Sequence, residues 1–288
     1  MVSGDIKALA RSISLVENEA AGYEDFMEQL PTGHAKIIGI TGPPGAGKST
    51  LADALVGLLN EGENKIALLC IDPSSPFNLG ALLGDRVRMS RWFNDPNIFI
   101  RSLASRGSLG GLAAKIIEIT ALVKAAGFKY IIIETVGVGQ SEVEIAGLAD
   151  VTIVTIVPEG GDEIQTMKAG LMEIADIFVV NKADRPGADE YVKNLRNMLA
   201  PAFSNHAREV PIIKTIASVA DGVGKLKDAV EKLLLSPNHN EKKCWLLAER
   251  AWQLIIQKRM KGISKASLQE AIANQGDAFN LYRFIKQF

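Results

Sequence analysis

The sequence predicts an α/β fold in which a doubly wound, mostly parallel sheet carries helical extensions at both ends. Three observations predict this fold. Apolar runs rich in Ile and Val recur through the middle of the chain, as expected for strands whose two faces are covered by helices. Segments with helical periodicity separate these runs. A glycine-rich turn joins the first run to a helix, and 288 residues suffice for one large domain with appendages.

The strands and helices of the central region are predicted from these runs and the periodic segments between them. The predicted strands are 36–41, 66–72, 130–135, 151–157, 177–181 and 211–215, with 98–101 as a further candidate. The predicted helices are 48–59, 109–126, 163–174 and 222–234.

Both ends of the chain are predicted to form helical extensions. Residues 1–34 hold one amphipathic helix, marked by apolar residues at helical spacing, and a second short helix. The central domain is predicted to span 35–235. The segment 236–288 begins with a linker and continues as helices, the first with Trp245 and Trp252 on one face. This segment is either a helical cap on its own domain or a dimerisation arm, and we predict the dimerisation arm.

Composition excludes several classes of function. With a formal net charge of −1, nothing points to nucleic acid or to an anionic membrane as the main partner. No apolar run approaches the length of a membrane span. Cys70 and Cys244 form no paired motif, which indicates reduced thiols in a cytoplasmic protein.

The glycine-rich turn is Gly42-Pro43-Pro44-Gly45-Ala46-Gly47-Lys48-Ser49-Thr50, which has the spacing of a phosphate-binding P-loop. Glycines let backbone N–H groups approach a phosphate, and the following helix directs its positive end at the same anion. Lys48 adds a charge against the outer phosphates, and the Ser49 hydroxyl suits Mg²⁺. A chance glycine turn is disfavoured because a strand and a helix flank the motif.

The segment Asn181-Lys182-Ala183-Asp184 follows another predicted strand and has the form of the guanine-specificity element of GTPases. The Asp184 carboxylate accepts hydrogen bonds from the N1–H and the 2-amino group of guanine. Adenine offers neither donor, so the carboxylate would be left unpaired against it. GTP and GDP are therefore the expected ligands. The alternative is that Asp184 only caps the next helix.

The segment Glu134-Thr135-Val136-Gly137-Val138-Gly139-Gln140 ends a third strand. A carboxylate at that place normally holds Mg²⁺ or its water shell, and the Gly137 N–H suits the γ-phosphate. In Ras-like GTPases a water-orienting glutamine follows the equivalent glycine directly, whereas here Gln140 lies two residues beyond that position. We assign Lys48, Glu134 and Gln140 to catalysis and expect slow hydrolysis that a partner accelerates.

Further stretches point to one family. They are Cys70-Ile71-Asp72-Pro73-Ser74-Ser75-Pro76-Phe77, Gly84-Asp85-Arg86-Val87-Arg88-Met89, Ser105-Arg106-Gly107-Ser108-Leu109-Gly110-Gly111 and residues 158–168. With the motifs above, they resemble the MeaB/ArgK family of P-loop GTPases over most of the chain. The resemblance implies a homodimeric chaperone that uses GTP or GDP with Mg²⁺. Its client would be an adenosylcobalamin-dependent acyl-CoA mutase, chiefly methylmalonyl-CoA mutase, whose cofactor loading it gates.

The resemblance also implies residue roles. Ser49 ligates Mg²⁺, Asp72 and Asp85 are switch acids that approach the metal, and Glu134 is the acid of a second switch. Locally, Asp72 is equally consistent with a turn before Pro73, and Asp85 with a solvated loop charge. Residues 157–168 resemble a third switch that couples the nucleotide to the mutase. Its coupling residues would be Asp162, Gln165 and Lys168, although an exposed lysine is the usual alternative.

The chain departs from the family pattern in its second guanine-binding segment. Lys214-Thr215 is followed by Ile216-Ala217-Ser218, where Ser-Ala is usual. We expect residues Ile216, Ala217 and Ser218 to contact the base, with the Ala217 N–H reaching O6. The missing hydroxyl at position 216 predicts weaker guanine affinity. A further departure is Glu159 before two glycines in the third-switch segment.

Three other functions remain open from the sequence. An ATP-using kinase for a transport-associated protein is disfavoured by the guanine motif and by the lack of a protein-kinase catalytic loop. A metal-inserting GTPase of similar fold is disfavoured by the lack of His- or Cys-rich tracts. A scaffold that binds nucleotide without turnover would release no phosphate.

Overall fold

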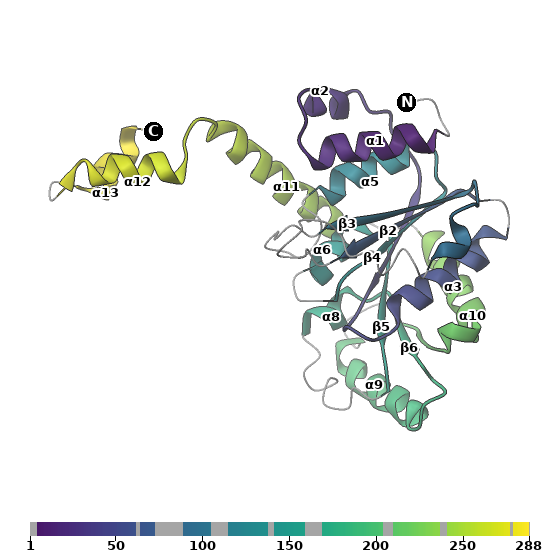
Figure 1. Cartoon of the computed structure of the whole chain (residues 1–288). Coiled ribbons are helices and arrows are strands. Elements are labelled where there is room, and N and C mark those ends of the chain that lie inside the picture. The colour runs from purple at the N-terminus through teal and green to yellow at the C-terminus, as the bar shows by residue number, and fades with distance from the viewer. Residues whose placement is uncertain are drawn as a thin grey trace. The chain divides into compact units, whose positions relative to one another are not determined.

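Figure 1 shows the chain as a computed structural model. The structure describes residues 5–61, 64–72, 89–104, 115–137, 141–158, 169–203, 210–236, 241–276 and 279–287. Two compact units make up the chain, Met1–Lys243 and Cys244–Phe288.

The first unit is built on a seven-stranded sheet in the order β3-β2-β4-β1-β5-β6-β7, and every strand pair is parallel. The predicted doubly wound α/β class is thereby confirmed. The strands are β1 (Lys36–Thr41), β2 (Ile66–Asp72), β3 (Ile98–Ala104), β4 (Tyr130–Glu134), β5 (Val151–Ile156), β6 (Ile177–Asn181) and β7 (Ile212–Thr215). All six predicted strands and the seventh candidate exist, although β3 runs three residues further than its predicted end at Arg101.

The strand register brings the polar residues of the motifs to one edge of the sheet. Glu134 at the end of β4 lies beside Ile40 of β1 and Cys70 of β2, and Asn181 of β6 lies beside Thr215 of β7. Because the strands are parallel, their carboxyl ends all face the same way, which is where α/β folds place ligands.

Helices cover both faces of this sheet (Figure 1). The α3 helix (Lys48–Asn60) and α10 (Val223–Leu234) pack on one face through a fully apolar core. The α8 helix (Ala169–Ile174) and α9 (Ala188–Phe203) pack on the other, together with α6 (Ser141–Leu148). The predicted α3 and α10 are confirmed within one or two residues. The predicted helices 109–126 and 163–174 correspond in their described parts to α5 (Ile116–Ala125) and α8.

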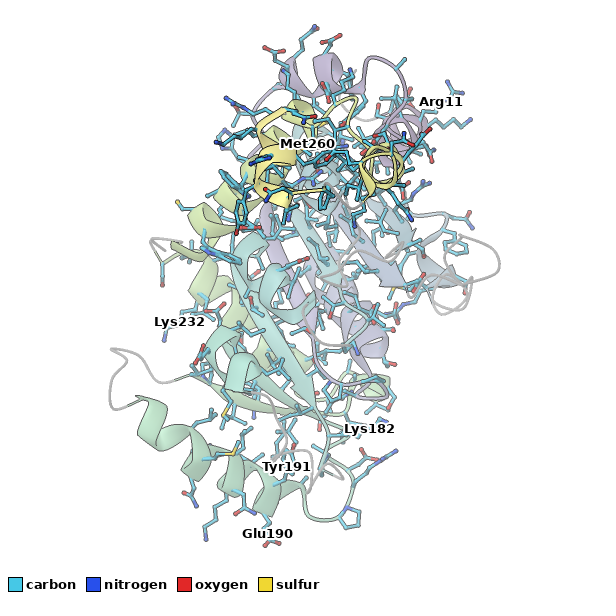
Figure 2. The ribbon with its side chains drawn as sticks, turned by 90° about the vertical axis from the view of Figure 1, so that its left-hand side faces the viewer. Arg11, Lys182, Glu190, Tyr191, Lys232 and Met260 are labelled. Atoms are coloured by element: carbon cyan, nitrogen blue, oxygen red, sulfur yellow. The ribbon has the colours of Figure 1, made fainter. Side chains whose placement is uncertain are left out.

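The sequence prediction named neither α6 nor α9. The signal for α9 was present, because Tyr191, Leu195 and Leu199 recur every four residues and are buried against the sheet. Their neighbour Glu190 is exposed; Figure 2 labels both Glu190 and Tyr191. The α9 helix therefore has the amphipathic pattern expected of a helix covering a sheet.

The N-terminal extension belongs to the first unit. In α1 (Ile6–Glu17), Leu9, Ile13 and Val16 are buried, as the periodicity predicts, and α1 packs against α5. The short α2 spans Tyr23–Glu28. Arg101 of β3 fixes α1 to the sheet, because its Nη2 donates to Glu17 Oε2 at 2.6 Å and to Ser14 Oγ at 3.1 Å.

The second unit holds most of α11 (Glu241–Arg259), with α12 (Lys265–Ala273), α13 (Leu281–Phe284) and a final 3-10 turn. Ser264 and Ser267 form a capping box at the start of α12. On α11, Trp245 is 59% and Trp252 61% exposed. No helix in the described ranges is both long and apolar enough to span a bilayer.

Candidate functional site

The P-loop links β1 to α3. Gly47 adopts a left-handed conformation immediately before the first residue of the helix, Lys48. The Lys48 ammonium donates to the carbonyl oxygens of Gly42 at 2.9 Å and Pro43 at 3.0 Å, so it is folded over the loop. Lys48 is nearly buried, which makes its charge strong at the place where phosphate oxygens would lie.

Two glycines are required by close backbone approaches. Gly42 has φ 136°, and a Cβ there would overlap the carbonyl of Thr155 in β5. Gly137 has φ 87°, and a Cβ there would overlap the Gly42 carbonyl and lie 2.9 Å from Lys48 Nζ. The structure therefore brings Gly137 directly against the P-loop lysine, where the sequence predicts a contact to the γ-phosphate.

A set of hard oxygen donors lies beside the P-loop. Ser49 Oγ donates to Glu134 Oε1 at 2.6 Å, and both residues are buried. Asp72 ends β2, two residues beyond the residue that pairs with Glu134, and is also buried. Adjacent ligands of an octahedral Mg²⁺ lie about 2.9 Å apart, given metal–oxygen distances of about 2.05 Å. The separation of the Ser49 and Glu134 oxygens fits two such neighbours after a small movement.

Asn181 joins three parts of the site through one buried amide. Its Nδ2 donates to the carbonyl of Ala46 in the P-loop at 2.9 Å. Its Oδ1 accepts from Thr215 Oγ1 at 3.0 Å and from the Ala217 N–H at 3.1 Å. Asn181 thus ties the phosphate loop to both segments predicted to bind the base.

The rest of the guanine motif is placed for ligand contact. Lys182 has a left-handed backbone, φ 56°, and its ammonium donates to the carbonyl of Gly45 at 2.8 Å (Lys182 is labelled in Figure 2). The Ala183 N–H donates to the carbonyl of Thr215 at 3.0 Å, which fixes the motif against β7. Asp184 is exposed, so its carboxylate is accessible to a base.

In the second guanine-binding segment, one hydrogen-bond donor has a different acceptor from the one that the sequence predicts. The Ala217 N–H was expected to reach guanine O6, but it donates to Asn181. Thr215, which the sequence analysis did not include in the site, is buried and holds the same amide. A threonine at the end of a strand just before the base-binding segment was the signal that was available for it.

The structure places the P-loop residues from Gly42 to Thr50, together with Asp72, Glu134 and Gly137, around one end of the sheet, and ties Asn181 and Ala217 to the same loop. The predicted residues Asp85, Gln140, Asp162, Gln165 and Lys168 lie outside the described residues. Within the described ranges, no three His, Cys, Asp or Glu side chains form a metal-binding cluster.

A P-loop and a guanine motif at the carboxyl edge of one parallel sheet define a P-loop GTPase. Residues 9–266 match the family described as Methylmalonyl Co-A mutase-associated GTPase MeaB. This chain belongs to that family, and it is a GTPase that binds guanine nucleotide.

Relatives by sequence support this assignment. A putative GTPase of Pyrococcus abyssi is 47% identical over 238 residues, which is 81% of this chain and 73% of the relative. GTPase ArgK of Escherichia coli is 41% identical over 187 residues, 63% of this chain and 56% of the relative. A protein named fused isobutyryl-CoA mutase, from Geobacillus kaustophilus, is 38% identical over 231 residues, 75% of this chain and 21% of that protein.

Solved structures agree with the fold. A crystal structure described as LAO/AO transport system kinase has a TM-score of 0.67 at 25% identity, covering 99% of this chain and 92% of that one. HypB from Helicobacter pylori, solved with nickel, has a TM-score of 0.53 at 15% identity, covering 79% of this chain and 95% of that one. The HypB likeness shows the fold alone.

Proposed function

We propose that this GTPase is a chaperone for an adenosylcobalamin-dependent acyl-CoA mutase, with methylmalonyl-CoA mutase as its main client. The single observation that carries the proposal is the match of residues 9–266 to a family described as mutase-associated. A relative whose name is that of a fused mutase adds support, because there a similar GTPase sequence is part of a mutase chain. In this role the nucleotide state gates the loading of intact cofactor and the release of damaged cofactor.

The chain's own residues provide a way to sense the nucleotide. A Cβ on Gly137 would overlap the Gly42 carbonyl and lie 2.9 Å from Lys48 Nζ, so Gly137 packs closely against the P-loop and an added γ-phosphate would have to reorganise this region. Gly137 is also the last residue before the segment 138–140. A change at the phosphate therefore begins at the base of the segment predicted to act as a switch.

Mg²⁺ is the proposed cofactor beside the nucleotide. Ser49 and Glu134 would hold it directly or through water, with Asp72 next to them, and the ion would offset phosphate charge during hydrolysis. Lys48 would stabilise the same charge from the side of the loop. Because Val138 directly follows Gly137 and Gln140 lies two residues beyond the place of a water-orienting glutamine, we expect slow basal turnover.

The test is steady-state phosphate release with and without a saturating cobalamin-dependent acyl-CoA mutase from the same organism. The mutase is expected to accelerate hydrolysis by ordering the switch segments. An unchanged rate with every such mutase of that organism would contradict the chaperone function and leave the GTPase assignment intact.

Lys168→Ala refines this test, because Lys168 has a proposed role in transmission alone. The variant should lose mutase-stimulated turnover more than basal turnover. Lys232→Ala is the matched control, since Lys232 is an exposed lysine on α10 (Figure 2). If Lys168→Ala lowers the basal and the mutase-stimulated rate by the same factor, Lys168 acts in the site or in stability generally, and its proposed role in transmission is wrong.

A kinase remains the second candidate, because the structure that matches 99% of this chain is described as a transport system kinase. The two candidates differ in nucleotide and in product. A kinase would transfer phosphate from ATP to a protein, whereas the GTPase releases phosphate from GTP to water. Nucleotide competition and labelled-phosphate transfer separate them.

A further inference from the structure

Lysines occupy the starts of three adjacent strands, at the amino ends of the sheet. The Lys36 N–H of β1 donates to the Lys129 carbonyl at 2.9 Å, and the Lys129 N–H donates to the Lys65 carbonyl at 2.8 Å. Lys129 and Lys65 directly precede β4 and β2, the next strands in the sheet, and neighbouring strands lie about 4.8 Å apart. All three residues are exposed, so three positive charges lie along one edge.

A fourth lysine, Lys124 of α5, lies against the same edge. A Cβ on Gly33 would overlap the Lys124 carbonyl, so the segment that leads into Lys36 packs directly on the Lys124 backbone. Burial lowers the pKa of Lys124 below its ordinary value of 10.5, and the charge of Lys243 lowers it further. Asp150 opposes this shift, whereas Lys36 adds to it. An anion bound here would relieve the repulsion between these like charges. We call the following four residues the amino-edge lysines: Lys36, Lys65, Lys124 and Lys129.

The carboxylates on this edge already accept hydrogen bonds from the protein's own N–H groups. Asp150 Oδ2 accepts from the Ile37 N–H at 2.7 Å. Asp95 Oδ1, just before β3, accepts from the Asn97 N–H at 2.9 Å. Among the residues that the structure describes, no carboxylate forms an ion pair with any of the amino-edge lysines. Their positive charge is therefore available to a partner.

The chemistry of this edge favours the carboxylates of a protein partner. Phosphate is most often held bidentately by arginine, whereas lysine is a hydrated point charge on a flexible stem, and the group contains only lysines. A nucleic acid or an anionic membrane calls for a wider basic field, and the formal net charge of the chain is −1. Exposed lysines facing carboxylates speed association and help to select the partner.

We propose that the amino-edge lysines dock a carboxylate-rich surface of the client mutase. The proposal rests on the chaperone function proposed above and adds where the partner is held. The P-loop follows the carboxyl end of β1, so this contact lies at the opposite end of the sheet from the nucleotide. Docking there is the same with GTP and with GDP, and it leaves the switch segments free to respond to the nucleotide.

The experiment measures the dissociation constant of the complex with a cobalamin-dependent acyl-CoA mutase of the same organism, by calorimetric titration. The full-length protein is compared with Lys36→Glu/Lys65→Glu. The constant should rise about two- to thirtyfold at low salt, since two exposed ion pairs are lost. The factor should be equal with GDP and with a non-hydrolysable GTP analogue, and added salt should reduce it. Basal GTP hydrolysis should be unchanged. Lys36→Ala/Lys65→Ala should show a smaller rise.

Lys193→Glu/Arg196→Glu is the matched control, because it makes the same change of charge on exposed residues of α9 and should leave the dissociation constant unaltered. An unchanged constant in Lys36→Glu/Lys65→Glu, or an equal rise in the control, would overturn the docking surface and leave the chaperone function intact. Binding to phosphatidylserine vesicles that this variant loses, with mutase affinity unchanged, would assign the lysines to a membrane and also overturn the proposal. An unmodified protein that binds no such mutase would contradict the chaperone function itself, and this contact with it.

Discussion

Asn181 shows how one side chain can organise a nucleotide site. Its amide reaches the P-loop, the end of β7 and the following turn with three hydrogen bonds. A buried amide with its acceptor and donor both used is stable and geometrically specific. The phosphate end and the base end of the site are thereby fixed relative to each other before nucleotide arrives.

Lys48→Ala should abolish GTP hydrolysis and weaken nucleotide binding by at least about tenfold, since a charge-assisted contact contributes about 1.5–3 kcal/mol. The physical reason is the loss of the one P-loop side-chain charge. Phosphate release and calorimetric titration measure the two effects. Lys193→Ala, an exposed lysine on α9, is the control. Near-normal turnover in Lys48→Ala would rule out the assigned role of the P-loop.

Asp184→Asn should lose the preference for guanine, because an amide cannot accept both hydrogen bonds from the base. The loss for GDP should be about ten- to hundredfold, the range for a hydrogen bond to a charged group. Xanthosine diphosphate carries a 2-keto group that accepts from an amide, so the variant should bind it better than the unmodified protein does. Unaltered GDP affinity in this variant would mean that Asp184 does not contact the base.

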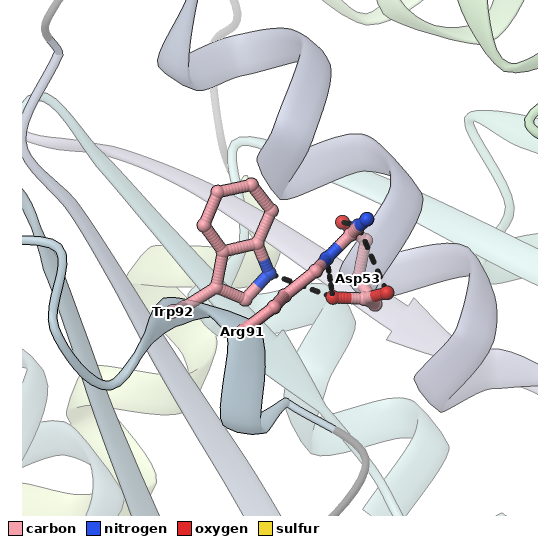
Figure 3. A network of polar contacts seen from close by, with 3 residues as sticks. All are labelled: Asp53, Arg91 and Trp92. Carbon is pink, nitrogen blue, oxygen red and sulfur yellow. Dashed lines mark hydrogen bonds and ion pairs between the residues drawn. The ribbon is translucent and has the colours of Figure 1, made fainter.

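At the scale of the secondary-structure elements, three side chains join α3 to the segment that precedes β3 (Figure 3). Asp53 of α3 accepts from Trp92 Nε1 at 2.6 Å and from Arg91 Nε at 2.9 Å, and its other oxygen pairs with Arg91 Nη2 at 2.9 Å. The Arg91 guanidinium also lies 4.5 Å from the centre of the Trp92 ring. The Asp53 cluster thus holds the second turn of α3, the helix that follows the P-loop, against this segment.

Asp53→Ala should lower the free energy of unfolding by about 2 kcal/mol, because it removes a charged acceptor from the half-buried indole N–H. Arg91→Ala should cost less than about 1 kcal/mol, since the Arg91 side chain is 54% exposed and surface ion pairs contribute little. Urea denaturation of both variants measures the difference. A larger loss for Arg91→Ala than for Asp53→Ala would show that the ion pair dominates the cluster.

The α6 helix contains a carboxylate whose stability effect depends on pH. Burial raises the pKa of Glu144 above its ordinary value of 4.5, so the folded protein holds this proton more tightly than the unfolded chain does. Stability from this group is therefore full below about pH 4.5 and is lost as pH rises through the folded-state pKa.

Glu144→Gln removes this titration and should raise the melting temperature at pH 8. The advantage over the unmodified protein should shrink as the pH falls toward 4.5. Thermal unfolding followed by circular dichroism across that range is the measurement. An advantage that is constant with pH would mean that the substitution acts through packing and not through charge.

At the scale of the whole molecule, the first unit carries every described residue of the nucleotide site, and the second carries a set of exposed apolar side chains on α11. The α11 residues Trp245, Leu247, Trp252, Ile255 and Ile256 are each more than 40% exposed. So much exposed apolar surface on a small unit is typical of an interaction site. We propose a second copy of this chain as its partner, which makes residues 236–288 a dimerisation arm.

Trp252→Glu in the full-length chain should shift a dimer toward monomer, because a charge in an apolar interface is left unpaired. Light scattering at micromolar concentration measures the mass of both proteins. Lys232→Glu, on α10, is the control, because it changes the charge and leaves the exposed apolar side chains of α11 unaltered. A monomeric unmodified protein, or a dimer unaffected by Trp252→Glu, would contradict the arm.

The sequence by itself determined the class of this protein. The P-loop and the guanine motif are short, contiguous and tied to the chemistry of their ligand, and the Ile- and Val-rich runs gave all seven strands. Such features are readable because period and spacing are local properties of the chain. Among the helices, the prediction missed α6 and α9, which pack with α8 on one face of the sheet, although α9 carries a clear four-residue pattern.

Only the tertiary structure decided how the motifs engage one another. The Asn181 amide meets the Ala46 carbonyl across 135 positions, and Gly137 meets Lys48 only because β4 lies beside β1. The same applies to the Ala217 N–H, whose donor role was read from its motif and whose actual acceptor is Asn181. Hydrogen-bond partners far apart in sequence are chosen by strand order and register, which no local pattern encodes.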